Sequence, residues 1–211
     1  MIIGSWHPSV VLTYVGAATS ALGMSQASGG HPRGAVACLV VAGLADLFDG
    51  PVARATSRTD AQRAFGVQVD SLADVFSFVA FPVVLVAALV GRWWVVPVVA
   101  LYTVTGLARL THFTVAAAGA GAGADAGAGD DTRQRHFRGL PVTYAALVLP
   151  LTALLRPHLG AGFAPLITLV TAALAVLFVL DVPVPKPRGV AYVALGLLAV
   201  AIMVALVVVG I

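Results

Sequence analysis

One stretch of the sequence decides the fold class: Val67-Gln-Val-Asp70-Ser-Leu-Ala-Asp74-Val-Phe-Ser-Phe-Val-Ala-Phe-Pro-Val-Val-Leu-Val-Ala-Ala-Leu-Val90. It contains two charged side chains, Asp70 and Asp74, and none after them. A helix that spans a bilayer needs about 20 mostly apolar residues. The stretch is predicted to be a transmembrane helix, because a chain inside a bilayer must satisfy its backbone hydrogen bonds internally.

The composition extends this interpretation to the whole chain. Its 211 residues are 60% hydrophobic and 10% charged, whereas soluble domains carry about 25% charged residues. Apolar segments cover residues 9–27, 34–57, 67–90, 93–117, 139–156, 162–180 and 189–210. We therefore predict an all-α polytopic membrane protein, a single domain over 1–211, with six to eight transmembrane helices and seven as the preferred number. The Gly/Ala-rich stretch 116–131 is predicted to be a flexible linker, and the net charge of +3 does not favour a nucleic-acid partner.

Basic residues predict the orientation. With seven spans and the amino terminus in the cytoplasm, three basic residues fall outside: Arg33, Arg92 and Arg156. The other nine lie inside or at the inner boundary: Arg54, Arg58, Arg63, Arg109, Arg133, Arg135, Arg138, Lys186 and Arg188. Because positive charge is enriched in cytoplasmic loops, we predict a multi-pass cell-membrane protein whose aspartates lie at the cytoplasmic face.

Four aspartates stand out against the apolar background. Asp46 and Asp49 are three residues apart, and Asp70 and Asp74 are four apart, so each pair shares one helix face. The short polar stretch 56–63 brings the two faces together. An ionised Asp within a membrane helix costs about 2.5–3.5 kcal/mol, and four would repel one another without cations. Carboxylate oxygens without nearby Cys or a His cluster favour Mg²⁺ or Mn²⁺.

Small and basic residues flank these carboxylates. Gly50 and Gly66 permit close approach of a bulky phosphate ligand. Arg54 follows Gly50 by one turn, where a guanidinium can bind a phosphate. The residues alone also allow buried Asp–Arg pairs that serve packing, or a divalent-cation transporter. The grouping of the acids at one membrane face disfavours a pathway through the membrane.

The pattern Asp46-x2-Asp49-Gly50-x2-Ala53-Arg54-x11-Gly66-x3-Asp70-x3-Asp74 resembles the signature of the CDP-alcohol phosphotransferases at all eight fixed positions. The resemblance implies that the four aspartates hold Mg²⁺ or Mn²⁺, with two ions expected, and that Asp74 also acts as the catalytic base. It further implies that a CDP-lipid is bound by Gly50, Ala53, Arg54 and Gly66. Members of this family form homodimers in the membrane, and a homodimer is expected here.

Finer features are similar to the phosphatidylserine synthase branch of that family. In that branch Asp-Ser-Leu-Ala-Asp is followed by apolar sequence and Ser-Phe, as in residues 65–78 here. Val75 follows the last aspartate, where the glycerol phosphate and inositol phosphate branches carry Lys or Arg. The segments 107–113 and 137–141 also resemble this branch. The implied reaction transfers a phosphatidyl group from CDP-diacylglycerol to L-serine and releases CMP.

Three arginines are candidates for binding the acceptor or a phosphate: Arg63, Arg109 and Arg138. Arg63 departs from the family pattern, which often has Ser at this position. A snorkelling side chain at the membrane boundary is the alternative for Arg109, and a positive-inside anchor is the alternative for Arg138. Because these arginines could also bind a phosphorylated alcohol, inositol phosphate or glycerol phosphate remains the alternative acceptor.

Overall fold

The computed structural model describes residues 7–57, 59–122, 136–185 and 190–209. Its helices are α1 (Pro8–Ser28), α2 (Pro32–Ala55), α3 (Asp60–Asp74), α4 (Phe81–Val90), α5 (Val96–Ala122), α6 (Ala145–Ala153), α7 (Arg156–Leu159), α8 (Phe163–Val179) and α9 (Val190–Val209). A π-helical turn, η1 (Val75–Ala80), joins α3 to α4, and 3₁₀ turns occupy Trp93–Val95, Val142–Tyr144 and Gly160–Gly162.

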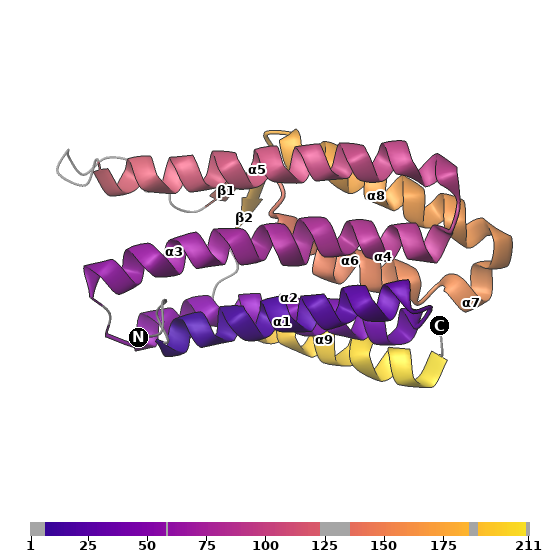
Figure 1. Ribbon diagram of the computed structural model, residues 1–211, viewed down its shortest axis with the longest axis horizontal. Helices are drawn as coiled ribbons and strands as arrows, with labels where there is room; N and C mark the ends of the chain where they lie inside the picture. The colour runs from indigo at the N-terminus through magenta and orange to yellow at the C-terminus, as the bar shows by residue number, and fades with distance from the viewer. Residues whose placement is uncertain (1–6, 58, 123–135, 186–189, 210–211) are drawn as a thin grey trace.

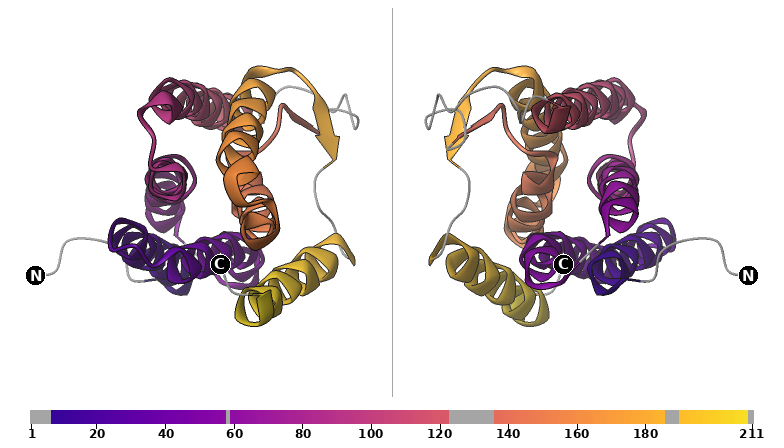
Figure 2. Two further views of the ribbon diagram at one scale, coloured as in Figure 1. Left: turned by 90° about the vertical axis from the view of Figure 1, so that its right-hand side faces the viewer. Right: turned by 90° about the vertical axis from the view of Figure 1, so that its left-hand side faces the viewer.

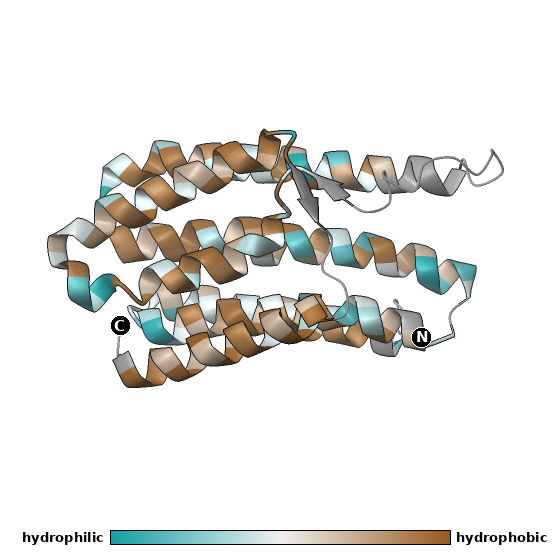
Figure 3. Ribbon diagram, turned by 180° about the vertical axis from the view of Figure 1, so that it is seen from behind, coloured by the Kyte–Doolittle hydropathy of each residue, from teal (hydrophilic) through white to brown (hydrophobic). Residues whose placement is uncertain are grey.

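The long helices lie side by side and alternate in direction along the chain (Figure 1). α1 packs against α2, and α5 packs against α8. Seen end-on, α9 lies at the outside of the bundle (Figure 2), where it contacts α2 and α6. Brown hydrophobic residues dominate the ribbon in Figure 3, as expected for a bundle whose surface faces lipid.

Among the residues that the structure describes, five helical segments are long and apolar enough to cross a membrane: Pro32–Ala53, Asp60–Val90, Trp93–Ala116, Arg156–Val179 and Val190–Val208. The apolar helix Val142–Ala153 is shorter than these. α1 has 21 residues but includes several Ser and Thr residues and a Gln, which lower its hydropathy. The all-α polytopic fold is confirmed, and each of the seven predicted segments coincides with helical structure.

Two local features differ from the sequence prediction. α5 continues to Ala122, so the linker predicted from residue 116 begins as helix; alanine is the strongest helix former, which explains the extension. Residues 123–131 of that linker lie outside the described residues. Two short strands, β1 (His136–Arg138) and β2 (Pro183–Pro185), pair antiparallel and tie the segment before α6 to the segment after α8.

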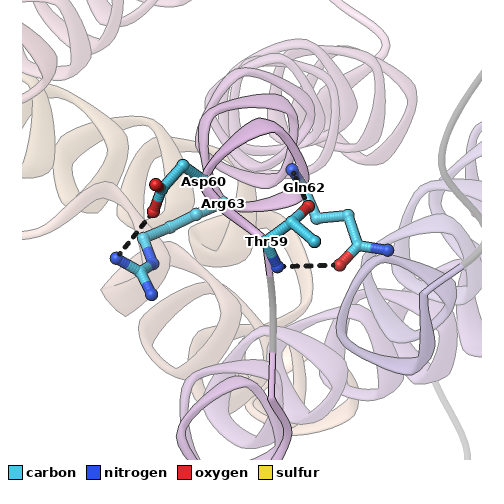
Figure 4. A network of polar contacts seen from close by, with 4 residues as sticks. All are labelled: Thr59, Asp60, Gln62 and Arg63. Carbon is cyan, nitrogen blue, oxygen red and sulfur yellow. Dashed lines mark hydrogen bonds and ion pairs between the residues drawn. The ribbon is translucent and has the colours of Figure 1, made fainter.

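The start of α3 has a clear local cause. The Gln62 amide N–H donates to the Thr59 hydroxyl at 3.2 Å, and the Thr59 amide N–H donates to Gln62 Oε1 at 3.0 Å (Figure 4). This reciprocal capping box satisfies two backbone donors that a helix start leaves unpaired. The helix therefore begins at Asp60, within the stretch 56–63 that was predicted to join the two acidic helices.

A buried apolar core holds the helices together. Tyr102 and Phe178 are among its largest members, with ring centroids 5.2 Å apart. Gly43 permits a close approach of α2 to α6, since a Cβ there would lie 2.7 Å from the Cβ of Ala146. The contact brings α6 against the part of α2 that leads to Asp46.

Candidate metal centre and adjoining cavity

Three of the predicted carboxylates meet where α2 faces α3. One carboxylate oxygen from each of Asp46, Asp49 and Asp70 lies within 4.8 Å of the other two. α3 runs antiparallel to α2 (Figure 1), and the spacing of three residues places both α2 carboxylates on one face of that helix. The chain reverses direction between the end of α2 at Ala55 and the start of α3 at Asp60 (Figure 1).

Asp74 lies beside this group, one helical turn after Asp70. Its side chain borders the same small cavity as the side chain of Asp46. All four aspartates line a cavity of about 10 Å³, which is close to the space that one water molecule or one ion needs. α1 contributes Thr13 and Gly16 to the wall of this cavity.

The donor set fits a hard divalent cation. An octahedral Mg²⁺ holds its oxygens at about 2.1 Å, which places neighbouring oxygens about 3 Å apart and opposite ones about 4 Å apart. The oxygens of Asp46, Asp49 and Asp70 lie within 4.8 Å of one another, a limit slightly above the distance between opposite ligands. No Cys or His joins the group among the residues that the structure describes. The site is therefore a candidate Mg²⁺ or Mn²⁺ site.

A larger cavity of about 280 Å³ opens next to the carboxylates. Asp46, Asp70 and Asp74 lie in its wall, while most of its other lining residues are apolar and come from α2, α5, α6 and α9. A polar cluster at the wall of an apolar cavity can hold the charged part of an amphipathic molecule and its apolar part at once.

The structure places only some of the predicted lipid-binding residues at a cavity. Gly50 lines the larger cavity, whereas Ala53 and Gly66 line neither cavity. Arg54 lies in α2 and Arg138 in β1, but both side chains fall outside the described part of the chain, so their predicted contacts stay predictions.

Arg63 lies away from the aspartate group. Its side chain is 62% exposed on the first turn of α3 and forms an ion pair with exposed Asp60 at 3.5 Å (Figure 4). The structure therefore does not bring Arg63 into either cavity, and its predicted contact with the acceptor has no geometric support.

Arg109 of α5 lines the larger cavity, and its side chain binds the backbone of the segment before α6. Its Nε donates to the Leu140 carbonyl and its Nη2 to the Gly139 carbonyl, both at 3.2 Å. Gly139 has φ +80°, and its amide donates to the Val182 carbonyl at 2.8 Å. Two guanidinium donors thus fix the turn that precedes the cavity residues Pro141 and Val142. A side chain that simply snorkels to the membrane boundary would not make these two bonds.

We expect Arg109→Lys to loosen this turn. A single ammonium cannot reproduce two donors in a fixed planar fork. Loss of one charge-assisted hydrogen bond is expected to lower the free energy of unfolding by about 1.5–3 kcal/mol. Thermal unfolding in detergent measures the change, and Arg63→Lys, at an exposed ion pair, is the control expected to stay within about 1 kcal/mol of wild type. Unchanged unfolding with a selectively raised KM for the acceptor would instead assign Arg109 to substrate binding.

Several lining residues were not predicted from the sequence. Thr13 and Gly16 come from α1, and the aromatic Tyr192 comes from α9. Tyr192, Leu195 and Ala199 follow the spacing i, i+3, i+7 on the face of α9 that meets the cavity. That spacing is a detectable signal, although it is also common in lipid-facing helices.

The fold and these cavities define an integral membrane protein with a candidate metal site at the edge of an apolar cavity. The sequence profile of the CDP-alcohol phosphatidyltransferase family matches residues 6–210. The chain belongs to this family, and it is a membrane transferase of phospholipid biosynthesis.

Two relatives are informative. An archaetidylserine synthase from Methanothermobacter thermautotrophicus is 29% identical over 183 residues, which cover 85% of this chain and 70% of that protein. A CDP-diacylglycerol–serine O-phosphatidyltransferase from Mycobacterium tuberculosis is 38% identical over 87 residues. That second match covers 39% of this chain and 29% of the relative. Serine occurs in both names.

Proposed function

We propose that this chain transfers a phosphatidyl group from a CDP-lipid, CDP-diacylglycerol in the first instance, to L-serine, and releases CMP. The observation that carries the proposal is the meeting of four carboxylates from α2 and α3 around one small cavity, with three of them also in the wall of the larger apolar cavity. Membership of the family supplies the reaction class, and the names of the two relatives favour serine as the acceptor.

The aspartates and the apolar cavity wall have different proposed roles. Asp46, Asp49 and Asp70 would hold the metal, with Asp74 beside them. Two divalent cations would match the four negative charges of the ionised aspartates. When bound there, divalent cations supply positive charge that neutralises the pyrophosphate and stabilises CMP as it leaves. The lipid part of the donor would extend along the apolar wall formed by α2, α6 and α9.

Asp74 is proposed as the base. A serine hydroxyl is a poor nucleophile at neutral pH, so a positioned group must take its proton as the new bond forms. The Asp74 carboxylate accepts that proton while the serine oxygen forms a bond to the phosphorus that carries the lipid. The bond from this phosphorus to the bridging oxygen breaks, and its electron pair leaves with CMP.

The proposal also includes a homodimer, taken from the family resemblance, and an active site at the cytoplasmic face of the cell membrane, taken from the distribution of basic residues. The positive-inside bias supports the orientation. Mass measurement of the purified protein in detergent or native nanodiscs tests the dimer, and a mass equal to one chain would contradict it.

Acceptor choice is tested by CMP release from purified protein. We expect release with L-serine and background release with inositol phosphate and glycerol phosphate. Ester-linked and ether-linked CDP-lipids are both supplied, because the two relatives differ in the lipid that their names carry. Release with a phosphorylated alcohol and not with serine would make the serine assignment wrong, and no release with any of the three alcohols would contradict the proposed reaction.

A further inference from the structure

A π-helical turn directly follows Asp74. In η1 the Phe81 amide N–H bonds to the Phe76 carbonyl, five residues earlier instead of four. Such turns are rare, are usually single insertions within an α-helix, and frequently occur at functional sites. One residue of helix register corresponds to about 100° of rotation around the helix axis. The turn therefore sets how Asp74 is oriented relative to α4, which is anchored in the buried core.

Proline has a direct effect on this turn. An α-helix would satisfy the Phe78 carbonyl with the amide of residue 82, but that residue is Pro82, which has no N–H. The proline ring also crowds the carbonyl four residues before it. Phe78 is 1% exposed, so water does not replace the missing donor.

Tyr102 of α5 supplies the donor. Its hydroxyl donates to the Phe78 carbonyl at 2.7 Å, and its side chain is fully buried. A second polar contact holds the same turn from the other side, where the hydroxyls of Ser20 in α1 and Ser77 in η1 share a hydrogen bond at 2.8 Å. Ser77 and Phe78 also line the small cavity that all four aspartates border.

We propose that Tyr102 is a positioning residue of the active site, which acts by holding the π-helical turn and so the direction of the Asp74 carboxyl group. The proposal rests on the proposed function, since it takes Asp74 as the base. Tyr102 lines neither cavity, so its effect passes through its bond to the backbone of η1.

Three variants test the proposal: Tyr102→Phe, Pro82→Ala and Thr105→Val. Tyr102→Phe removes the donor and is expected to lower kcat roughly 10–100-fold with the KM for the CDP-lipid unchanged, because small misplacements of a catalytic group cost this much. Pro82→Ala gives the Phe78 carbonyl a competing α-helical donor. It is expected to keep or raise the unfolding temperature while kcat falls.

Thr105→Val is the matched control, since it removes a buried hydroxyl of the same helix, whose hydrogen bonds within the described part of the chain go to carbonyls of α5. It is expected to keep the wild-type kcat. If the η1 turn had a purely structural role, kcat would fall only where the folded fraction falls. A lower kcat in Pro82→Ala at an unchanged or higher unfolding temperature therefore supports a positioning role.

The result that would overturn the proposal is a wild-type kcat in Pro82→Ala, or a loss in Tyr102→Phe no larger than in Thr105→Val. Rates are measured with the acceptor that the wild-type protein uses, so a wrong acceptor affects only the proposed function. A wild-type protein that releases no CMP with any acceptor would overturn both.

Discussion

Asp74→Asn is expected to abolish CMP release while CDP-lipid binding remains measurable. The amide fills the space of the carboxylate but cannot accept the serine proton, and loss of a general base costs about 100–10,000-fold. Removal of one of four neighbouring negative charges lowers their mutual repulsion, so the variant is expected to fold. Turnover is followed as CMP release, and binding is followed by titration of the CDP-lipid in detergent.

Two further variants separate the base from the metal ligands. Asp46→Asn is expected to weaken both metal binding and CDP-lipid binding, because Asp46 belongs to the group of three oxygens suited to one cation. Asp60→Asn is the control, since Asp60 lies on the same helix as Asp74 but its side chain is 98% exposed. If Asp74→Asn and Asp46→Asn lose binding equally, Asp74 has no separate role as the base.

Removal of divalent cations is expected to have an equally large effect. Without them, the four carboxylates would repel the negatively charged pyrophosphate of a bound CDP-lipid. Activity should fall to background in excess chelator and return when Mg²⁺ or Mn²⁺ is added, whereas Ca²⁺ is expected to restore it poorly because it prefers more ligands at longer distances. Full activity in excess chelator would contradict the metal-assisted mechanism.

The fold class and the metal-site residues could be predicted from the sequence because both follow from short-range patterns. Apolar length predicts membrane helices, and the i, i+3 and i, i+4 spacings predict shared helix faces. The capping box at Thr59 and Gln62 is also a local signal, and it fixes where α3 begins. These patterns placed Asp46, Asp49 and Asp70 together before any tertiary contact was known.

The remaining parts of the site depend on contacts between distant segments. The bonds from Arg109 to Gly139 and Leu140 span about thirty residues of chain, and no local pattern encodes them. The same holds for Tyr102, whose hydroxyl partner is the Phe78 carbonyl on another helix. At Arg63 the local pattern and the fold differ. Its position in the motif suggested substrate binding, whereas the fold places the side chain on an exposed surface.

The central claim is that this chain moves a phosphatidyl group, and one labelling measurement tests it most directly. Purified protein is given serine, Mg²⁺ and CDP-diacylglycerol that carries ³²P in the phosphate attached to the lipid. We predict that the label appears in a serine-containing phospholipid and that the released CMP is unlabelled, because the serine oxygen attacks the labelled phosphorus. Label in a released nucleotide, or no labelled lipid product that depends on serine, would contradict the account.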